Sequence, residues 1–293
     1  MLSNEDLMKT NYGKFLETPG SYQLDKIPEA GNFEFILKNK CFFVKVDQFG
    51  PASITIDPPG GMTVLQRKER EQFSPWKYYF NDGKTVVNNF DIYSAKKMLI
   101  TYSPNKITYD LTFKTIKAVT EITVSELDRE AIMSVKLINL KANPTKVSVL
   151  GVGMLDPIDT TMAIWDKMSW YSTTEVDGVD NPLFLTKHFS VNGTKEDRRV
   201  IGLLFEGKAT SVQNSAEYLR TFTKGFTSLP KVISNGNTPV VACYEQGCGA
   251  MFEVNLDKEV ELLSILRVEP ENIDKSILDI LVLLIFKSPI YLF

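Results

Sequence analysis

The sequence predicts an all-β protein that folds as a large antiparallel β-sandwich. Three observations predict this class: apolar and polar residues alternate in several segments, turn-forming residues separate those segments, and few segments have a helical pattern. Alternation of this kind is typical of a strand with one face in the core and the other in solvent. The chain has 293 residues, a length that suits one large sandwich domain.

Strands are expected where this alternation, or a run of β-branched and aromatic residues, dominates. The clearest case contains Ile107, Tyr109 and Leu111, which alternate with threonine and aspartate. β-Branched and aromatic side chains pack well on a pleated surface, so the segments rich in them also favour strands. We expect strands, in chain order, at residues 33–46, 76–80, 85–90, 107–113, 121–125, 132–140, 146–152, 185–191 and 250–257.

Turn residues stand between these segments at two clear places. The sequence Asn81-Asp82-Gly83 follows the expected strand at 76–80, and an Asp-Gly pair readily adopts the positive φ angles of a tight hairpin. The pair Asn143-Pro144 follows the strand at 132–140, and proline cannot donate a hydrogen bond to a sheet. Both sites therefore predict hairpins between consecutive strands.

Helical patterns are few. Residues 4–15 predict one short helix, and residues 273–286, which follow Pro270, predict another. The pattern at 211–222 is ambiguous. The sequence therefore predicts no helical layer. The apolar face of each sheet then has to pack against another sheet.

Composition excludes several classes of partner. The net charge is −3, and no basic stripe interleaved with aromatic residues is present, so we expect no nucleic-acid partner. The apolar run 280–286 is seven residues long, whereas a membrane-spanning helix needs about 20, so we expect no membrane span. The three cysteines are too few and odd in number for a disulfide framework. The first residues lack a signal-peptide pattern, and we expect a cytoplasmic protein.

Few residues could carry chemistry. His188 is the single histidine, which excludes any mechanism or metal site that needs two imidazoles. Cys243 and Cys248 could form a zinc site only together with Cys41 and His188, and nothing in the sequence places these four residues together. We therefore expect no metal and no cofactor.

Aromatic residues are the better candidates for a binding function. Trp165, Trp170 and Tyr171 lie with Asp166 in a segment, 156–171, that lacks strand alternation. Sugars stack on exposed aromatic rings while nearby carboxylates bind their hydroxyl groups. We expect 156–171 to be an extended surface loop that contacts sugar or a partner subunit, with a satellite core as the alternative. Trp76 is a further contact candidate, although core packing is the default interpretation of its cluster at 73–80.

Several segments together resemble the N-terminal domain of the glycoside phosphorylases of glycoside hydrolase family 94, once classed as glycosyltransferase family 36. The segments are 119–128, which reads Val-Thr-Glu-Ile-Thr-Val-Ser-Glu-Leu-Asp, and the strand 134–140 after it. The step Asp197-Arg198-Arg199 before Val200-Ile201-Gly202 resembles another family motif, and 239–242 with 252–267 resembles its closing strand pair. The resemblance spans about residues 31–268.

The resemblance implies a β-supersandwich, similar to galactose mutarotase, followed by a helical linker and an (α/α)₆ barrel that carries the catalytic acid. It assigns residues 1–270 to the sandwich and 271–293 to an apolar tail that resembles a truncated linker. No segment matches the barrel, so no catalytic residue is carried over and enzymatic activity stays open. In the family, a loop at the position of 156–171 lies near the active-site entrance of the partner subunit. The resemblance thus implies a homodimer and a separate catalytic barrel.

Two other functions compete with this one. A stand-alone carbohydrate-binding module, which binds oligosaccharides weakly, would present an aromatic strip on an exposed sheet face. An enzyme of the aldose epimerase type would have a similar supersandwich, but its mechanism uses histidines together with a glutamate, and His188 is the only histidine here.

Overall fold

The computed structural model describes residues 9–28, 31–56, 62–66, 74–155, 158–159, 170–177, 180–190, 199–213 and 246–270. Within these ranges every helix-or-strand element is a β-strand, and every described strand pair is antiparallel. The predicted all-β class is therefore confirmed for the described part of the chain. The helix expected at 273–286 lies outside it.

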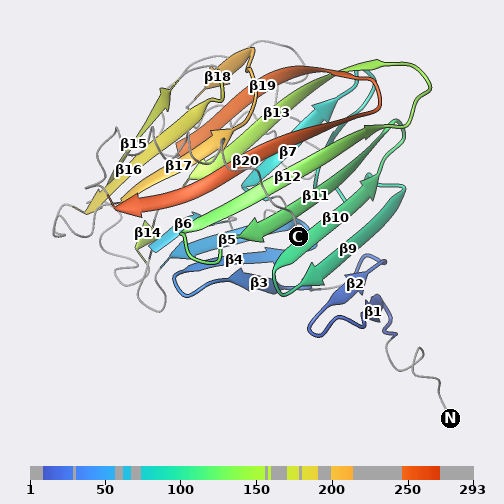
Figure 1. Ribbon diagram of the computed structural model, residues 1–293, viewed down its shortest axis with the longest axis horizontal. Helices are drawn as coiled ribbons and strands as arrows, with labels where there is room; N and C mark the ends of the chain where they lie inside the picture. Colours follow the sequence, from blue (N-terminus) through green and yellow to red (C-terminus); the bar gives the residue numbers. More distant parts are fainter. Residues whose placement is uncertain are drawn as a thin grey trace.

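One layer of the sandwich is a ten-stranded sheet (Figure 1). Its strands, in spatial order, are β1 (Gly13–Phe15), β2 (Tyr22–Leu24), β9 (Lys97–Ser103), β10 (Lys106–Thr112), β11 (Ile116–Val124), β12 (Glu130–Asn139), β20 (Glu259–Pro270), β17 (Arg199–Phe205), β16 (Leu183–Ser190) and β15 (Trp170–Asp177).

The other layer consists of two five-stranded sheets. The first, which we call the β13 sheet, has the order β18 (Ser211–Gln213), β19 (Gln246–Leu256), β13 (Thr145–Leu155), β7 (Trp76–Asn81) and β8 (Val86–Asn88). The second, the β5 sheet, has the order β14 (Ile158–Asp159), β6 (Met62–Gln66), β5 (Gly50–Ile56), β4 (Phe42–Asp47) and β3 (Phe35–Lys38).

Both five-stranded sheets contact the ten-stranded sheet. Trp76 Nε1 on β7 donates a hydrogen bond to Ser264 Oγ on β20 at 3.0 Å, and the Tyr109 hydroxyl on β10 donates to the Asp47 carbonyl on β4 at 2.6 Å. The expectation of two large sheets packed face to face is thus corrected in one respect. The second layer is divided into two sheets. β13 is the central strand of one of them, and β14, the next strand along the chain, is an edge strand of the other.

Most of the expected strands and turns match the structure, whereas the segment expected as one strand at 33–46 contains two, β3 and β4, with residues 39–41 between them. On β10 the residues Ile107, Tyr109 and Leu111 are fully buried while those between them are partly exposed. β7 and β8 form the hairpin predicted at Asn81-Asp82-Gly83. The turn predicted at Asn143-Pro144 connects β12 to β13. Local alternation and turn chemistry therefore determine these elements.

The helix expected at 4–15 is wrong for its described residues. Gly13–Phe15 is strand β1, and Lys9 forms a bridge with Lys14. The Thr10 hydroxyl accepts hydrogen bonds from the backbone N–H groups of Tyr12 and Gly13, at 3.3 and 3.1 Å. Threonine competes in this way with helical hydrogen bonding, and here it forms a turn instead. The ambiguous segment at 211–222 begins as strand β18, and its remaining residues lie outside the described ranges.

Candidate functional site at the β14–β15 edge

Three consecutive strands of the chain, β13, β14 and β15, belong to three different sheets. β13 lies in the β13 sheet, β14 forms the edge of the β5 sheet, and β15 forms the edge of the ten-stranded sheet. β14 pairs with β6, with Ile158 opposite Thr63 and Asp159 opposite Met62. The stretch 156–171, which the sequence marks as a contact region, therefore connects the edges of two sheets.

The expectation of one extended loop over 156–171 needs a correction. Two short portions are strands: Ile158–Asp159 is β14, and Trp170 and Tyr171 begin β15. Trp170 pairs with Ser190, and Tyr171 pairs with Phe189. No local pattern indicated these strands, because cross-strand pairing with β6 or β16 produces no period within the segment itself. Trp165 and Asp166 lie outside the described residues.

β15 is an edge strand. In the described sheet it pairs with β16 on one side, and it ends the strand order there. The outer side of an edge strand presents backbone N–H and C=O groups that can pair with another chain. The predicted contact residues Trp170 and Tyr171 thus begin a strand whose position suits contact with a second molecule.

Trp76 is not a contact residue. Its side chain is 0% exposed and lies between the two layers, where its indole N–H is satisfied by Ser264. The default interpretation of this cluster, core packing, is the correct one for Trp76. A buried indole that donates its N–H to a neighbouring strand fixes the packing of the two layers and has no face left for a sugar.

A cluster of charged residues lies at the end of β20 and the start of β12. The Arg267 guanidinium contacts Glu269 at 2.6 Å, Glu130 at 3.2 Å and Asp128 at 3.7 Å. Burial raises the pKa of Glu130, aided by the nearby carboxylates of Asp128 and Glu269, although Arg267 opposes this shift. Perturbed carboxyl groups occur at functional sites and also in structural ion-pair networks. Here Arg267 is shared among three carboxylates, which favours a structural network.

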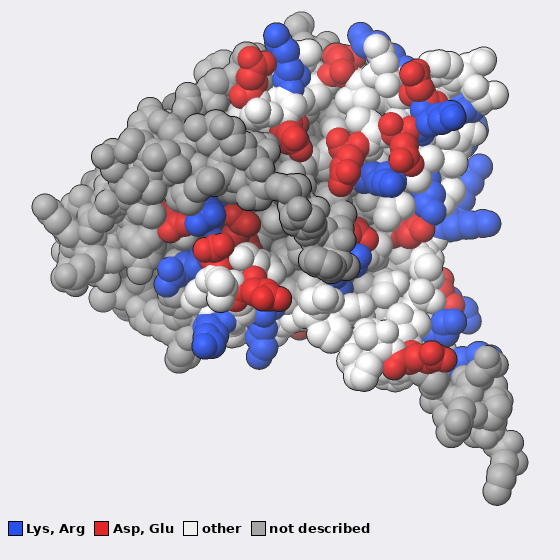
Figure 2. Space-filling model, in the orientation of Figure 1, with Lys and Arg blue, Asp and Glu red and all other residues white. Residues whose placement is uncertain are grey.

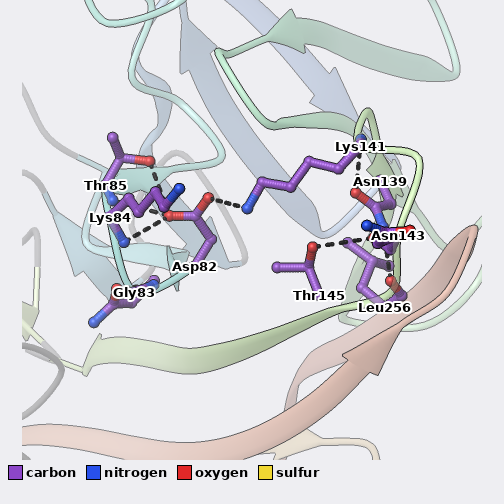
Figure 3. Close-up of polar contacts among 10 residues, drawn as sticks. Asp82, Gly83, Lys84, Thr85, Asn139, Lys141, Asn143, Thr145 and Leu256 are labelled. Atoms are coloured by element: carbon purple, nitrogen blue, oxygen red, sulfur yellow. Dashed lines mark hydrogen bonds and ion pairs between the residues drawn. The ribbon is translucent and has the colours of Figure 1, made fainter.

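A second polar cluster joins the hairpin turns at the opposite end of β12 (Figure 3). Asp82 Oδ1 accepts hydrogen bonds from the backbone N–H groups of Lys84 and Thr85, at 3.0 and 2.9 Å, and Oδ2 accepts one from Lys141 Nζ at 2.9 Å. Asn139 Nδ2 donates to the carbonyls of Asn143 and Leu256, both at 2.9 Å. These bonds connect the β7–β8, β12–β13 and β19–β20 turns.

The electrostatics of Asp82 exclude a role as an acid. Burial alone would raise the pKa of its carboxyl group, but the hydrogen bonds from Lys141 and from the backbone of Thr85 and Lys84 outweigh burial and lower the pKa far below the usual range. A carboxylate held ionised in this way, with both oxygens in use, is a structural anchor for the turn.

The other candidate residues are not brought together. His188 lies on β16, opposite Ser172 and Arg199, whereas Cys41 precedes β4 in the β5 sheet. Cys248 on β19 is buried, and its thiol contacts the Gly153 carbonyl at 3.4 Å; burial raises the pKa of this thiol above its ordinary value. Cys243 lies outside the described residues. In the described ranges no three His, Cys, Asp or Glu side chains gather so as to hold a metal ion.

Sequence reasoning missed both charged clusters. Glu130 and Arg267 are separated by 137 positions, and Asp82 and Lys141 by 59, so no local pattern connects them. The Asp-Gly turn signal identified the position of Asp82 but not its partner. Across the part of the chain that the structure describes, no helix is long and apolar enough to cross a membrane.

Comparisons with known proteins define the class of fold. No protein-family model matches the chain and no curated protein matches its sequence. Among solved structures, a protein assigned as a kojibiose phosphorylase from the human microbiome matches 94% of this chain, with a TM-score of 0.54 and 11% identity. A bacterial glucoamylase in complex with acarbose matches 86% of the chain, with a TM-score of 0.46 and 11% identity. A protein assigned as an aldose 1-epimerase from Escherichia coli K12 matches 82% of the chain, with a TM-score of 0.44 and 8% identity.

The first of these matches shows that the chain has the β-sandwich fold of a domain that occurs in a carbohydrate-active enzyme. The chain spans 36% of the length of the kojibiose phosphorylase and 36% of that of the glucoamylase, whereas it spans 99% of the epimerase. At such low identity the likeness concerns the fold alone. The resemblance to glycoside hydrolase family 94 therefore stays a proposal.

Proposed function

We propose that this chain is a non-catalytic N-terminal β-sandwich domain of a carbohydrate-active glycoside phosphorylase that acts on a β-glucan or a β-linked disaccharide. The observation that carries the proposal is the fold match, in which 94% of this chain corresponds to about a third of a phosphorylase chain. In this proposal residues 1–270 form the sandwich domain, the missing catalytic barrel is a partner, and the protein is a cytoplasmic homodimer.

The β14–β15 edge supports the proposed role in assembly. The stretch from 156 to 171 connects two sheet edges and contains the candidate contact residues Trp165, Asp166, Trp170 and Tyr171. Edge strands pair readily with other chains, and aromatic residues contribute much of the binding energy at interfaces. In the proposal this edge organises the dimer and shapes the entrance to the partner subunit's active site.

The carboxylates of the described residues support a non-catalytic role. The two most perturbed, Asp82 and Glu130, are each paired with a cation, Lys141 and Arg267 respectively. Glycoside cleavage needs two carboxyl groups placed on either side of the scissile bond, with one free to donate a proton. A carboxylate engaged by an internal cation and by backbone donors is poorly suited to that task.

The test of this proposal is an assay of the purified chain with β-linked gluco-oligosaccharides and inorganic phosphate. We expect no sugar phosphate to be released, because the barrel that carries the catalytic acid in the family has no match in this sequence. Release of sugar phosphate that is abolished by Glu130→Gln, with Asp110→Asn as the control for a surface carboxylate, would contradict the proposal.

One observation favours the alternative of a stand-alone carbohydrate-binding module. At the β1–β2 edge, the ring of Phe15 is half exposed and contacts Tyr22 at 5.1 Å between centroids. Tyr22 stacks in turn on Phe33 at 5.6 Å, with 13° between the ring planes. If the chain acts as a module through these rings, oligosaccharide binding will be lost with Phe15→Ala and retained with Trp165→Ala.

A further inference from the structure

Strand β3 is an edge strand of the β5 sheet. Among the described strands it pairs with β4 alone, and it borders the sheet in Figure 1. β14 forms the opposite edge of the same sheet, so β3 is separate from the β14–β15 edge. An edge strand presents backbone N–H and C=O groups that a further strand can pair with. β3 is therefore a place where a second molecule can extend the sheet.

The hydrogen bonds of the β3–β4 hairpin show which backbone groups of β3 face outward. The Asn39 N–H donates to the Phe42 carbonyl at 3.0 Å. Hydrogen-bonded and non-hydrogen-bonded pairs alternate along an antiparallel ladder, so every second residue counted back from Asn39 is bonded to β4. The N–H and C=O groups of Ile36 and Lys38, which lie between these residues, point away from β4. They are the groups that the edge offers to another strand.

The outer face of this edge carries an acid, an apolar residue and a base in order. Ile36 is 49% exposed, with Glu34 two residues before it and Lys38 two residues after it. Both charged residues are exposed. Glu34 forms an ion pair at 2.7 Å with Lys45, the residue that lies opposite Ile36 on β4. Leu37 points the other way and is buried in the core. Glu34, Ile36 and Lys38 therefore share the solvent-facing side of the sheet.

This order of side chains is self-complementary. In an antiparallel pair of identical strands, a two-fold axis at Ile36 places Ile36 opposite Ile36 of the second copy and each Glu34 opposite Lys38 of the other copy. Opposite charges directly across a strand pair stabilise it, and like charges destabilise it. The same register brings the outward N–H and C=O groups of the two Ile36 residues together as a hydrogen-bonded pair. A register shifted by two residues would place Ile36 opposite a charge.

The edge is also held in place before any partner binds. Asn39 Nδ2 donates to the carbonyls of Ser125 and Asp128, both at 2.8 Å. Asn39 Oδ1 accepts from the backbone N–H groups of Cys41 and Phe42, both at 2.8 Å. Asn39 thus connects the β3–β4 turn to the β11–β12 turn of the ten-stranded sheet. A strand that is already ordered loses little conformational entropy when it pairs.

We propose that β3 pairs antiparallel with β3 of a second copy of this chain, about a two-fold axis at Ile36. A single short strand pair buries less surface than a stable dimer does, so the contact forms at high protein concentration. Charged side chains on an edge limit non-specific growth of a sheet, and here they restrict pairing to one register. The inference does not depend on the proposed function, because β3 and β14 are opposite edges of the β5 sheet.

The first test exchanges the two charges. Glu34→Lys and Lys38→Glu are made singly and together, and self-association is measured by sedimentation up to high protein concentration. We expect each single change to weaken association several-fold, because it places like charges opposite each other, and the double change to restore it. Lys136→Glu is the control, because Lys136 is a half-exposed ion-paired lysine on β12, and it should leave association unchanged. Single changes without effect, or a double variant that associates no better than the singles, would overturn the proposal.

The second test locates the contact. Ile36→Cys is treated with a short bifunctional thiol reagent, which can join the two thiols because the Cα atoms of a hydrogen-bonded antiparallel pair lie about 5.5 Å apart. We expect covalent dimers in which both linked peptides, identified by mass spectrometry, contain position 36. Leu140→Cys is the matched control, since Leu140 is 47% exposed, and it should give far fewer dimers. Equal yields from the two variants would overturn the proposal, even in a chain that dimerises through another edge.

Discussion

At the scale of single residues, the structure relies on polar groups that are fully satisfied at the ends of strands. Asp82 is the clearest case, because its buried carboxylate accepts bonds from two backbone N–H groups and from Lys141. Asn139 plays a similar role with its amide, which bonds the Asn143 and Leu256 carbonyls. These two side chains connect turns that are distant in sequence, and a hydrogen bond to a charged group is worth about 1.5–3 kcal/mol.

We expect Asp82→Asn to lower the free energy of unfolding by about 1–3 kcal/mol near neutral pH, because it removes the charge that Lys141 pairs with. The pKa of Asp82 is lower in the folded protein than in the unfolded chain. Its ionised form therefore stabilises the fold above the unfolded value of about 3.9, and this contribution is lost as the pH falls through the folded pKa. Chemical denaturation at pH 7 and at pH 3 measures both effects.

The matched control for this prediction is Asp110→Asn. Asp110 also forms an ion pair, with Lys117 at 2.8 Å, but both side chains are about a third exposed. Such surface pairs contribute about 0–1 kcal/mol. If the two substitutions cost the same at neutral pH, the anchoring role assigned to Asp82 is wrong.

At the scale of elements, the close packing of the two layers depends on glycines in β13. A Cβ atom on Gly151 would lie 2.5 Å from Cε1 of Phe205. The Phe205 ring cannot move aside easily, because it is fully buried and makes edge contacts with Tyr78 and Phe184 at 5.7 and 6.0 Å. β13 therefore approaches the ten-stranded sheet at a distance that only glycine allows.

We expect Gly151→Ala to destabilise the protein by about 1–3 kcal/mol, as overpacking of a core does. Gly202 on β17 is the control, because a Cβ there would have its nearest neighbour, Leu183 Cδ1, at an ordinary 3.6 Å. Gly202→Ala should be neutral or slightly stabilising. Thermal unfolding of both variants measures this difference, and a Gly151→Ala variant as stable as the unaltered chain would refute the packing argument.

The elements differ in how far sequence could predict them. β10 and β19 follow from strict alternation, because each has one face in the core and one outside. The hairpin at Asp82 follows from its turn residues. β14 and β15 could not be predicted, since each is defined by its pairing with another strand, β6 or β16, and its own residues show no alternation. The division of the second layer is likewise a long-range property. The prediction of a helix at 4–15 is wrong because the Thr10 side chain stabilises a turn.

The candidate site was predicted less completely than the fold. The sequence singled out the stretch 156–171 by its broken alternation and its indoles, and the structure shows that this stretch connects two sheet edges. It also marked Trp76, which proved to be buried. Composition cannot distinguish an indole between two layers from one on a surface, because both occur in aromatic-rich segments.

At the scale of the whole molecule, the net charge is only −3, and on the face drawn in Figure 2 acidic and basic side chains are interspersed. Long-range attraction to a charged polymer is therefore weak. Association with a second copy or with a neutral sugar has to rely on local apolar and aromatic contacts. We expect those contacts at the β14–β15 edge, where Trp170 and Tyr171 begin strand β15.

The most direct test of this account is the dimer dissociation constant, measured by sedimentation for the unaltered chain and for Trp165→Ala. An aromatic contact at an interface contributes roughly 1–3 kcal/mol, so we expect a dimer that dissociates at least several-fold more readily in the variant, with an unchanged melting temperature. A chain that is monomeric at all concentrations, or a variant that loses melting temperature while its dimer constant stays the same, would contradict the claim that this edge organises the dimer.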